Sequence, residues 1–141
     1  MIAVVPEEPR FDDALAGLPL TVVVNPIPAE GISGSIRIGI RTLPDDSPAV
    51  LIAVADQPYL TSDALADLIR AFVPGRIVVP RYGTQRGNPP IFDRRFFPEL
   101  LALDGDRGGQ LVLNAHSEAA LEIDLAARMG ADIDRPDDWQ V

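Results

Sequence analysis

The segment from residue 49 to residue 72 constrains the fold more than any other part of this sequence. Ala49 to Ala55 form an apolar run (AVLIAVA), which is ended by Asp56-Gln57-Pro58. Thr61 then precedes a helical pattern from Ser62 to Phe72, in which apolar residues recur at helical spacing. A strand that is apolar on both faces is typical of the middle of a parallel sheet covered by helices. This segment therefore predicts an α/β fold.

The rest of the chain continues the alternation of strands and helices. Apolar or β-branched runs predict further strands at Ile2–Val5, Leu20–Val24, Arg76–Val79, Ile91–Phe92, Leu121–Ile123 and Ala131–Asp134. Helices are expected at Phe11–Leu18, from Ile36 to Arg41, from Pro98 to Leu103 and around Gln110–Leu113. We expect one domain of residues 1–141 with a doubly wound, mostly parallel sheet.

The composition excludes several chemistries. The chain has no cysteine and a single histidine, and its 12 basic residues are all arginine. It therefore lacks a disulfide framework, a thiolate zinc site, Schiff-base chemistry and a phosphate-loop lysine. The net charge of −9 argues against nucleic acid or an anionic membrane surface as partner. The apolar runs are too short to span a bilayer and the N-terminus does not resemble a signal peptide, so we expect a cytoplasmic protein.

Carboxylates supply the first candidate site. Asp56 follows the strongest predicted strand, and ligands bind at the carboxyl edge of open α/β sheets. Its oxygens suit Mg²⁺ together with a phosphate-bearing substrate; alternatively, it is a turn aspartate that bonds its own backbone. Asp132 and Asp134 lie two residues apart and would complete a two-carboxylate metal site if their strand ends near Asp56. The alternative is a solvated acidic C-terminus.

Two loops supply further candidates. Gly31 to Ile40 is rich in small residues and hydroxyls, which allow a nucleotide to approach the backbone, although a helix cap explains the same pattern. Arg81 to Asn88 combines two arginines, Tyr82 and two glycines. Arginine suits a bidentate grip on phosphate and tyrosine stacks on a heterocycle. The alternative is a flexible loop with solvated arginines.

Taken in order, these pieces resemble the MobA-like NTP transferases, and within them the molybdenum cofactor cytidylyltransferases. The matching stretches are Asn25-Pro26 with Gly31 and Ser35 to Ile40, Ile52 to Thr61, Val79 to Tyr82 with Arg86 to Pro89, Gly105 to Gly108, and Asp132 to Asp138. The resemblance implies a sheet like that of the nucleotide-diphospho-sugar transferases. It also implies transfer of a nucleoside monophosphate, CMP in preference to GMP, from CTP or GTP to the phosphate of a molybdopterin, with Mg²⁺ as cofactor.

The resemblance assigns roles to individual residues. Asp56 is the catalytic residue, a nucleotide contact and the principal metal ligand, and Asp134 or Asp132 is the second acidic group. Gly31 and Ser35 contact the base. The acceptor side is assigned to Arg81, Arg86, Gly87, Asn88 and Asp106.

The sequence also departs from the family pattern. The family's first strand, its glycine-rich phosphate loop and that loop's lysine have no counterpart, which corresponds to roughly 50 residues. We therefore expect a truncated chain that releases no pyrophosphate by itself, and a homodimer that covers apolar strands near Leu20–Val24 and Ala49–Ala55. The alternative is a non-catalytic homologue that binds a nucleotide, a pterin or a partner protein.

Overall fold

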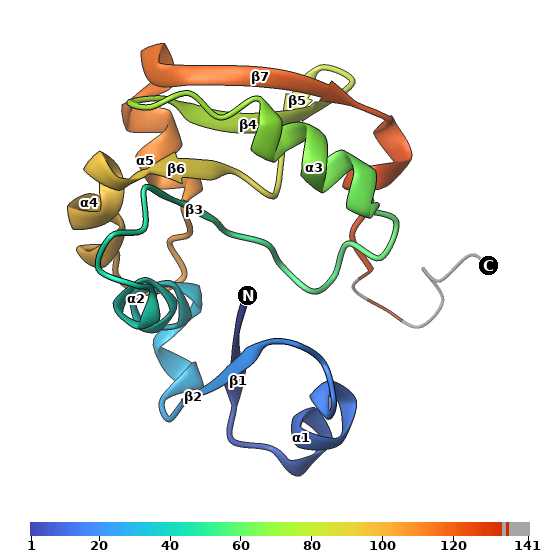
Figure 1. Cartoon of the computed structure of the whole chain (residues 1–141), viewed down its shortest axis with the longest axis vertical. Helices are drawn as coiled ribbons and strands as arrows, with labels where there is room; N and C mark the ends of the chain where they lie inside the picture. Colours follow the sequence, from blue (N-terminus) through green and yellow to red (C-terminus); the bar gives the residue numbers. More distant parts are fainter. Residues whose placement is uncertain (134, 136–141) are drawn as a thin grey trace. The chain divides into compact units, whose positions relative to one another are not determined.

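The computed structural model describes residues 1–133 and 135. The chain divides into two compact units, one formed by Met1–Ser47 with Phe96–Ala115 and the other by Pro48–Arg95 with the residues from His116 onward. Each unit has its own sheet (Figure 1). The expectation of a single domain stays a prediction. Within the described residues, no helix has the length and apolar character needed to cross a membrane.

The first unit is built on a parallel pair of strands. Strand β1 (Ile2–Pro6) leads through helix α1 (Pro9–Leu15) to β2 (Thr21–Asn25), and the two strands pair in parallel. A short 3₁₀ turn, η1 (Pro28–Glu30), precedes helix α2 (Ile32–Thr42). Helices α4 (Phe97–Leu101) and α5 (Gln110–Ala115) complete the unit.

Helix α2 forms the core of the first unit. Ile36 and Ile40 are four residues apart, so they share one face of the helix, and both are buried. A Cβ at Gly39 would lie 3.5 Å from the Val4 side chain, which shows how closely α2 packs on β1. From α4, Leu100 is fully buried. This packing fixes the first turn of α2, where the candidate nucleotide loop lies.

The second unit contains a mixed five-stranded sheet. Its strands are β3 (Ala49–Leu51), β4 (Ile77–Tyr82), β5 (Gln85–Arg86), β6 (Ile91–Asp93) and β7 (Ala120–Leu125). The order is β3-β6-β4-β5, and β7 pairs with β4 in parallel. Helix α3 (Ser62–Arg70) begins at Thr61, whose hydroxyl accepts a hydrogen bond from the Ala64 amide at 3.2 Å. The helix packs Leu68 against Val78 and Ile91. The short turns η3 (Ser117–Ala119) and η4 (Ala127–Gly130) also belong to this unit, whereas η2 (Arg94–Phe96) includes residues of both units.

The α/β class is confirmed, but three strand predictions are wrong in detail. The run Ala49–Ala55 forms a strand only over its first three residues. This strand is an edge strand that pairs antiparallel with β6, because β6 occupies the position beside β4. The run Leu20–Val24 is apolar on both faces, which predicts an interior strand, but Val22 and Val24 of β2 are exposed. Residues 131–133 form no strand, and Asp134 lies outside the described residues.

Candidate functional site

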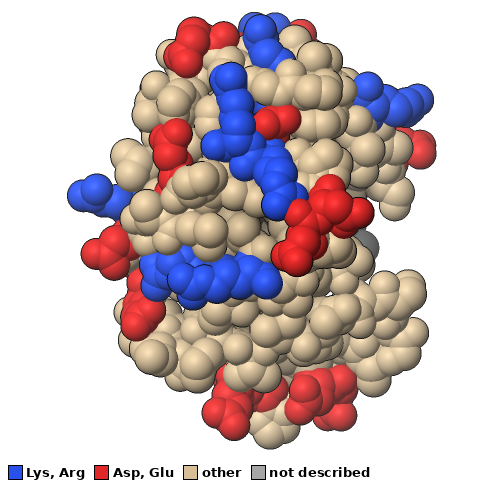
Figure 2. Space-filling view, turned by 60° about the vertical axis from the view of Figure 1, so that its left-hand side comes forward, with Lys and Arg blue, Asp and Glu red and all other residues tan. Residues whose placement is uncertain are grey.

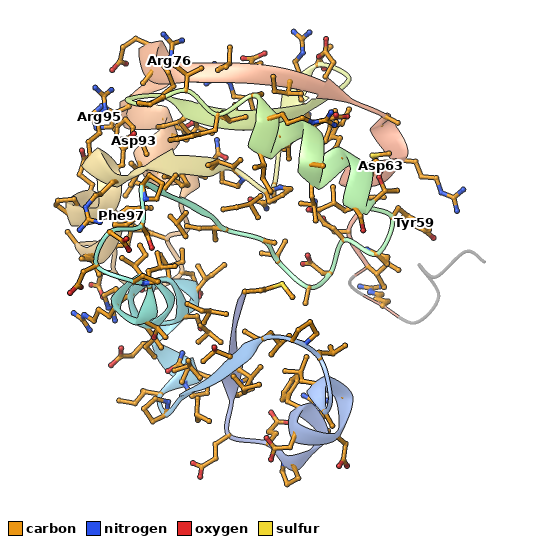
Figure 3. The ribbon with its side chains drawn as sticks, viewed as in Figure 1. Tyr59, Asp63, Arg76, Asp93, Arg95 and Phe97 are labelled. Atoms are coloured by element: carbon orange, nitrogen blue, oxygen red, sulfur yellow. The ribbon has the colours of Figure 1, made fainter. Side chains whose placement is uncertain are left out.

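The carboxyl ends of the parallel strands β4 and β7 lie side by side, with Tyr82 and Leu125 as their last paired residues. Ligands of open α/β folds bind at this edge of the sheet. Tyr59, in the turn before α3, lies at this end, whereas Arg76, Asp93 and Arg95 lie at the opposite end of the same sheet (Figure 3). At that opposite end, the Gly75 amide donates a hydrogen bond of 2.8 Å to Oδ2 of the Asp93 carboxylate.

Asp56 is exposed in a turn at the end of the apolar run, after β3 has ended at Leu51, and its exposure fits both the ligand role and the alternative of a turn aspartate. Its backbone carbonyl accepts a hydrogen bond from the Ile133 amide at 2.8 Å. The structure thus brings the segment with Asp132 beside Asp56, although the two are far apart in sequence. Across residues 1–133 and 135, no group of three or more His, Cys, Asp or Glu is gathered in a way that would hold a metal. The metal roles of Asp56 and Asp134 therefore stay predictions.

Gln57, next to Asp56, was not identified as a site residue from the sequence. Its side chain is only 9% exposed, and its Oε1 has no hydrogen-bond partner. A buried amide oxygen without a partner costs free energy, so such atoms call for an explanation, and a ligand is one of them. Its signals in the sequence were its position beside Asp56 in a proline-ended turn and its place in the family-like stretch from Ile52 to Thr61.

Tyr82 is held closely by its neighbours. Its hydroxyl donates a hydrogen bond to the Asn88 carbonyl oxygen at 2.6 Å. A Cβ at Gly87 would stand 2.7 Å from the ring, and one at Gly130 would stand 2.5 Å from its Cγ. Burial raises the pKa of the Tyr82 hydroxyl, and the negative charge of Asp132 raises it further. Gly87 and Asn88, expected at the acceptor, thus contact Tyr82 in this structure, and Gly130 had no recognisable sequence signal.

Both arginines of the predicted loop are paired with carboxylates. The alternative of a flexible loop is wrong, because Arg81 lies in β4 and Arg86 lies in β5. Arg81 binds Asp124 with two hydrogen bonds, of 2.5 and 2.8 Å, and Arg86 binds Glu122 at 2.8 Å. Hydrogen bonding to Asp124 raises the pKa of Arg81, and the same contact lowers the pKa of Asp124. Figure 2 shows arginine side chains next to acidic ones on one face of the molecule. Binding of an acceptor phosphate by Arg81 or Arg86 stays a prediction.

In the first unit, the structure brings Gly31 and Asp106 together. Gly31 has φ +81°, and a Cβ there would overlap Oδ1 of Asp106 and stand 2.7 Å from the Gly105 carbonyl oxygen. The Gly105 carbonyl also accepts from the Ser33 amide at 3.3 Å, within the first turn of α2. Ser35 accepts a hydrogen bond of 3.1 Å from the buried Asn25, which belongs to the family-like stretch Asn25-Pro26 but had no role assigned to it from the sequence.

Several solved structures are similar to the fold of this chain. The chain is similar to the crystal structure of Rv0371c from Mycobacterium tuberculosis H37Rv, with a TM-score of 0.81 and 25% identity over 97% of this chain and 71% of that one. The complex of that protein with manganese gives a TM-score of 0.78 and 23% identity, covering 97% and 74%. A nucleotidyl transferase from Methanothermobacter thermautotroptrophicus (Mth528) gives 0.82 and 19%, covering 97% and 68%. No curated protein shows a significant match.

The family assignment rests on the sequence. Residues 1–120 match the MobA-like NTP transferase domain, which is most of the 141-residue chain. The expected resemblance to this family is thus confirmed at the level of the family, and the nucleotidyltransferase-like fold is confirmed by the solved structures. The chain belongs to the MobA-like NTP transferase domain family and is a nucleotidyltransferase.

Proposed function

We propose that the chain transfers a nucleoside monophosphate, CMP in preference to GMP, from a nucleoside triphosphate to the phosphate of a molybdopterin-type acceptor. In this reaction an acceptor phosphate oxygen attacks the α-phosphorus, and the bond to the β-phosphate breaks to release pyrophosphate. The observation that carries the proposal is the hydrogen bond from the Ile133 amide to the Asp56 carbonyl. It supports a joint role of Asp56 and the acidic segment at the carboxyl end of β4.

The donor set fits a hard divalent cation. Asp56 and Asp132 are exposed carboxylates, and Gln57 adds a buried amide oxygen without a partner. Mg²⁺ needs only one or two carboxylates, because it keeps several waters and shares phosphate oxygens of the substrate. We therefore assign Mg²⁺ to Asp56, with Asp134 or Asp132 as the second carboxylate. When bound, the ion would neutralise charge on the triphosphate. Gly31 and Ser35 would contact the base, and Arg81, Arg86, Gly87, Asn88 and Asp106 the acceptor.

The test compares Asp56→Asn with Asp46→Asn, an exposed aspartate in the turn after α2. We expect Asp56→Asn to weaken Mn²⁺ binding, followed by the EPR signal of the free ion, by about tenfold or more. Both variants should unfold at the same urea concentration as the wild type. Equal Mn²⁺ affinity in wild type and Asp56→Asn would refute the metal site.

Two further measurements complete the experiment. Isothermal titration calorimetry compares the affinities for CTP and GTP, and an enzymatic assay measures pyrophosphate release in the presence of molybdopterin. Tighter binding of CTP and pyrophosphate release support the proposed transfer, and such release would also show that the expectation of no release by this chain alone, drawn from the sequence, is wrong. Nucleotide binding without release under any acceptor would instead favour the second candidate, a homologue that binds nucleotide without turnover. The paired state of Arg81 and Arg86 is the observation that favours this second candidate, since a paired guanidinium must exchange its partner to bind phosphate.

We also propose that the chain forms a homodimer through the outward face of β2. Val22 is 39% and Val24 45% exposed, and Leu18 and Ile27, at 51% and 53%, lie near the two ends of the strand. Exposed apolar residues that cluster in this way are typical of contact surfaces. Light scattering at about 100 μM should give the dimer mass; a monomer at this concentration would refute the interface.

A further inference from the structure

We propose that Tyr82 is a positioning residue, which holds the segment Gly130–Ile133 so that its acidic residue, Asp132, stands beside Asp56. The inference rests on the proposed function only in the use it gives to Asp56 and Asp132. The placement of the segment by Tyr82 is a separate claim, and it is tested separately below.

The ring of Tyr82 and the backbone of Gly130 are in intimate contact. A Cβ at Gly130 would stand 2.5 Å from Cγ and 2.9 Å from Cε2 of the ring. Carbon atoms prefer separations of about 3.5–4.0 Å. Gly130 has no positive φ, so its backbone conformation is open to any residue, and the three atoms nearest to an added Cβ all belong to the Tyr82 ring.

The ring itself is fixed from other directions. Its hydroxyl donates to the Asn88 carbonyl oxygen at 2.6 Å, and Gly87 approaches the same Cδ2–Cε2 side, with its absent Cβ 2.7 Å from Cε2. Tyr82 is the last residue of β4, where it pairs with Leu125 of β7 and Gln85 of β5. The Tyr82 ring is therefore held in place on the sheet, and Gly130 packs against it.

The segment has two further attachments on either side of Gly130. The Arg128 guanidinium lies over the Tyr59 ring at 4.3 Å, and the Ile133 amide bonds the Asp56 carbonyl at 2.8 Å. Only two residues separate Gly130 from Ile133. A displacement of the backbone at Gly130 should therefore also move the Ile133 amide away from the Asp56 carbonyl. A methyl group would need roughly 1 Å of movement to restore normal carbon contact. The same movement would lengthen the Ile133 hydrogen bond beyond its normal range.

The test measures hydrogen exchange of the Ile133 amide by NMR, which requires neither metal nor nucleotide. In the wild type this amide should be protected. Gly130→Ala should speed its exchange about five- to tenfold, the loss expected for one hydrogen bond, while the Val78 and Val79 amides of β4 stay unchanged. Gly108→Ala is the matched control, because Gly108 also lacks a positive φ and a Cβ there meets only Ile32, at 3.8 Å.

A second variant, Tyr82→Leu, removes the aromatic ring and should also speed the hydrogen exchange of the Ile133 amide. Adding Gly130→Ala to it should then have no further effect, because the ring that the methyl meets is gone. The affinity for Mn²⁺ should fall in each variant in which the Ile133 amide exchanges faster. If Tyr82 had only a structural role, Mn²⁺ affinity would not change together with this exchange. An unprotected Ile133 amide in the wild type, unchanged exchange in Gly130→Ala or Tyr82→Leu, or additive effects in the double variant would overturn the proposal. If only the metal or nucleotide measurements on the wild type fail, the proposed function is wrong and the positioning by Tyr82 stands.

Discussion

Replacing Gly31 with alanine should be among the most destabilising single changes in the first unit. Gly31 has φ +81° and ψ −174°, a region of backbone space used almost only by glycine, and a side chain there costs about 1–3 kcal/mol. The added methyl would also overlap Oδ1 of Asp106 and stand 2.7 Å from the Gly105 carbonyl oxygen. Such overpacking costs about 1–3 kcal/mol more. We therefore expect Gly31→Ala to lower the free energy of unfolding by about 4 kcal/mol.

The assay is urea unfolding followed by far-ultraviolet circular dichroism, with Gly17→Ala as the matched variant. Gly17 lies in the same unit and has φ +77°, but a Cβ there meets nothing within 4 Å, so this variant carries the backbone cost alone. Removing the Asp106 side chain should not rescue Gly31→Ala, because the Gly105 backbone still blocks the methyl. A loss in Gly31→Ala within about 1 kcal/mol of that in Gly17→Ala would refute the close approach.

Three other predictions concern the second unit. Thr61→Ala should cost about 1 kcal/mol in urea unfolding, because it removes the oxygen that accepts from the Ala64 amide. Leu68→Ala should cost about 2–5 kcal/mol in the same measurement, since Leu68 is fully buried. The lowered pKa of Asp124 means that its pairing with Arg81 stabilises the fold above the unfolded pKa of 3.8 and ceases to do so as the pH falls through the lower folded value. Asp124→Asn should therefore flatten the acid side of the stability profile measured by thermal unfolding between pH 2 and 6 (about the range over which carboxylates titrate).

The helix that begins at Thr61 shows which features could be predicted from the sequence. Its cap and its buried Leu68 are signals within one short segment, so no distant residue was needed to read them. The run Ala49–Ala55 shows the limit of such reasoning. Its composition indicates burial, but its place in the sheet depends on β6, which lies about 40 residues away and takes the position beside β4.

The same distinction holds for the candidate site. From the sequence, the approach of the Asp132 segment to Asp56 is only a condition for a shared metal site. The hydrogen bond from the Ile133 amide to the Asp56 carbonyl meets that condition, although residues 131–133 form no strand. The pairing of Arg81 and Arg86 with carboxylates of β7 could not be predicted, since it requires the register between β4 and β7. The contact between Tyr82 and Gly130 also depends on that register, and a glycine in a short 3₁₀ turn gives no local signal of it.

Both units place an acidic segment by the same physical means. In one, Gly31 admits the turn with Asp106, and in the other, Gly130 lets the segment with Asp132 pack on Tyr82. In both places the absence of a side chain is what makes the close approach possible. A change from aspartate to asparagine at these segments therefore alters charge while leaving the packing intact. A change from glycine to alanine moves the segment while leaving its charge intact. Within each unit, the two kinds of variant separate what the carboxylates contribute chemically from what their placement contributes.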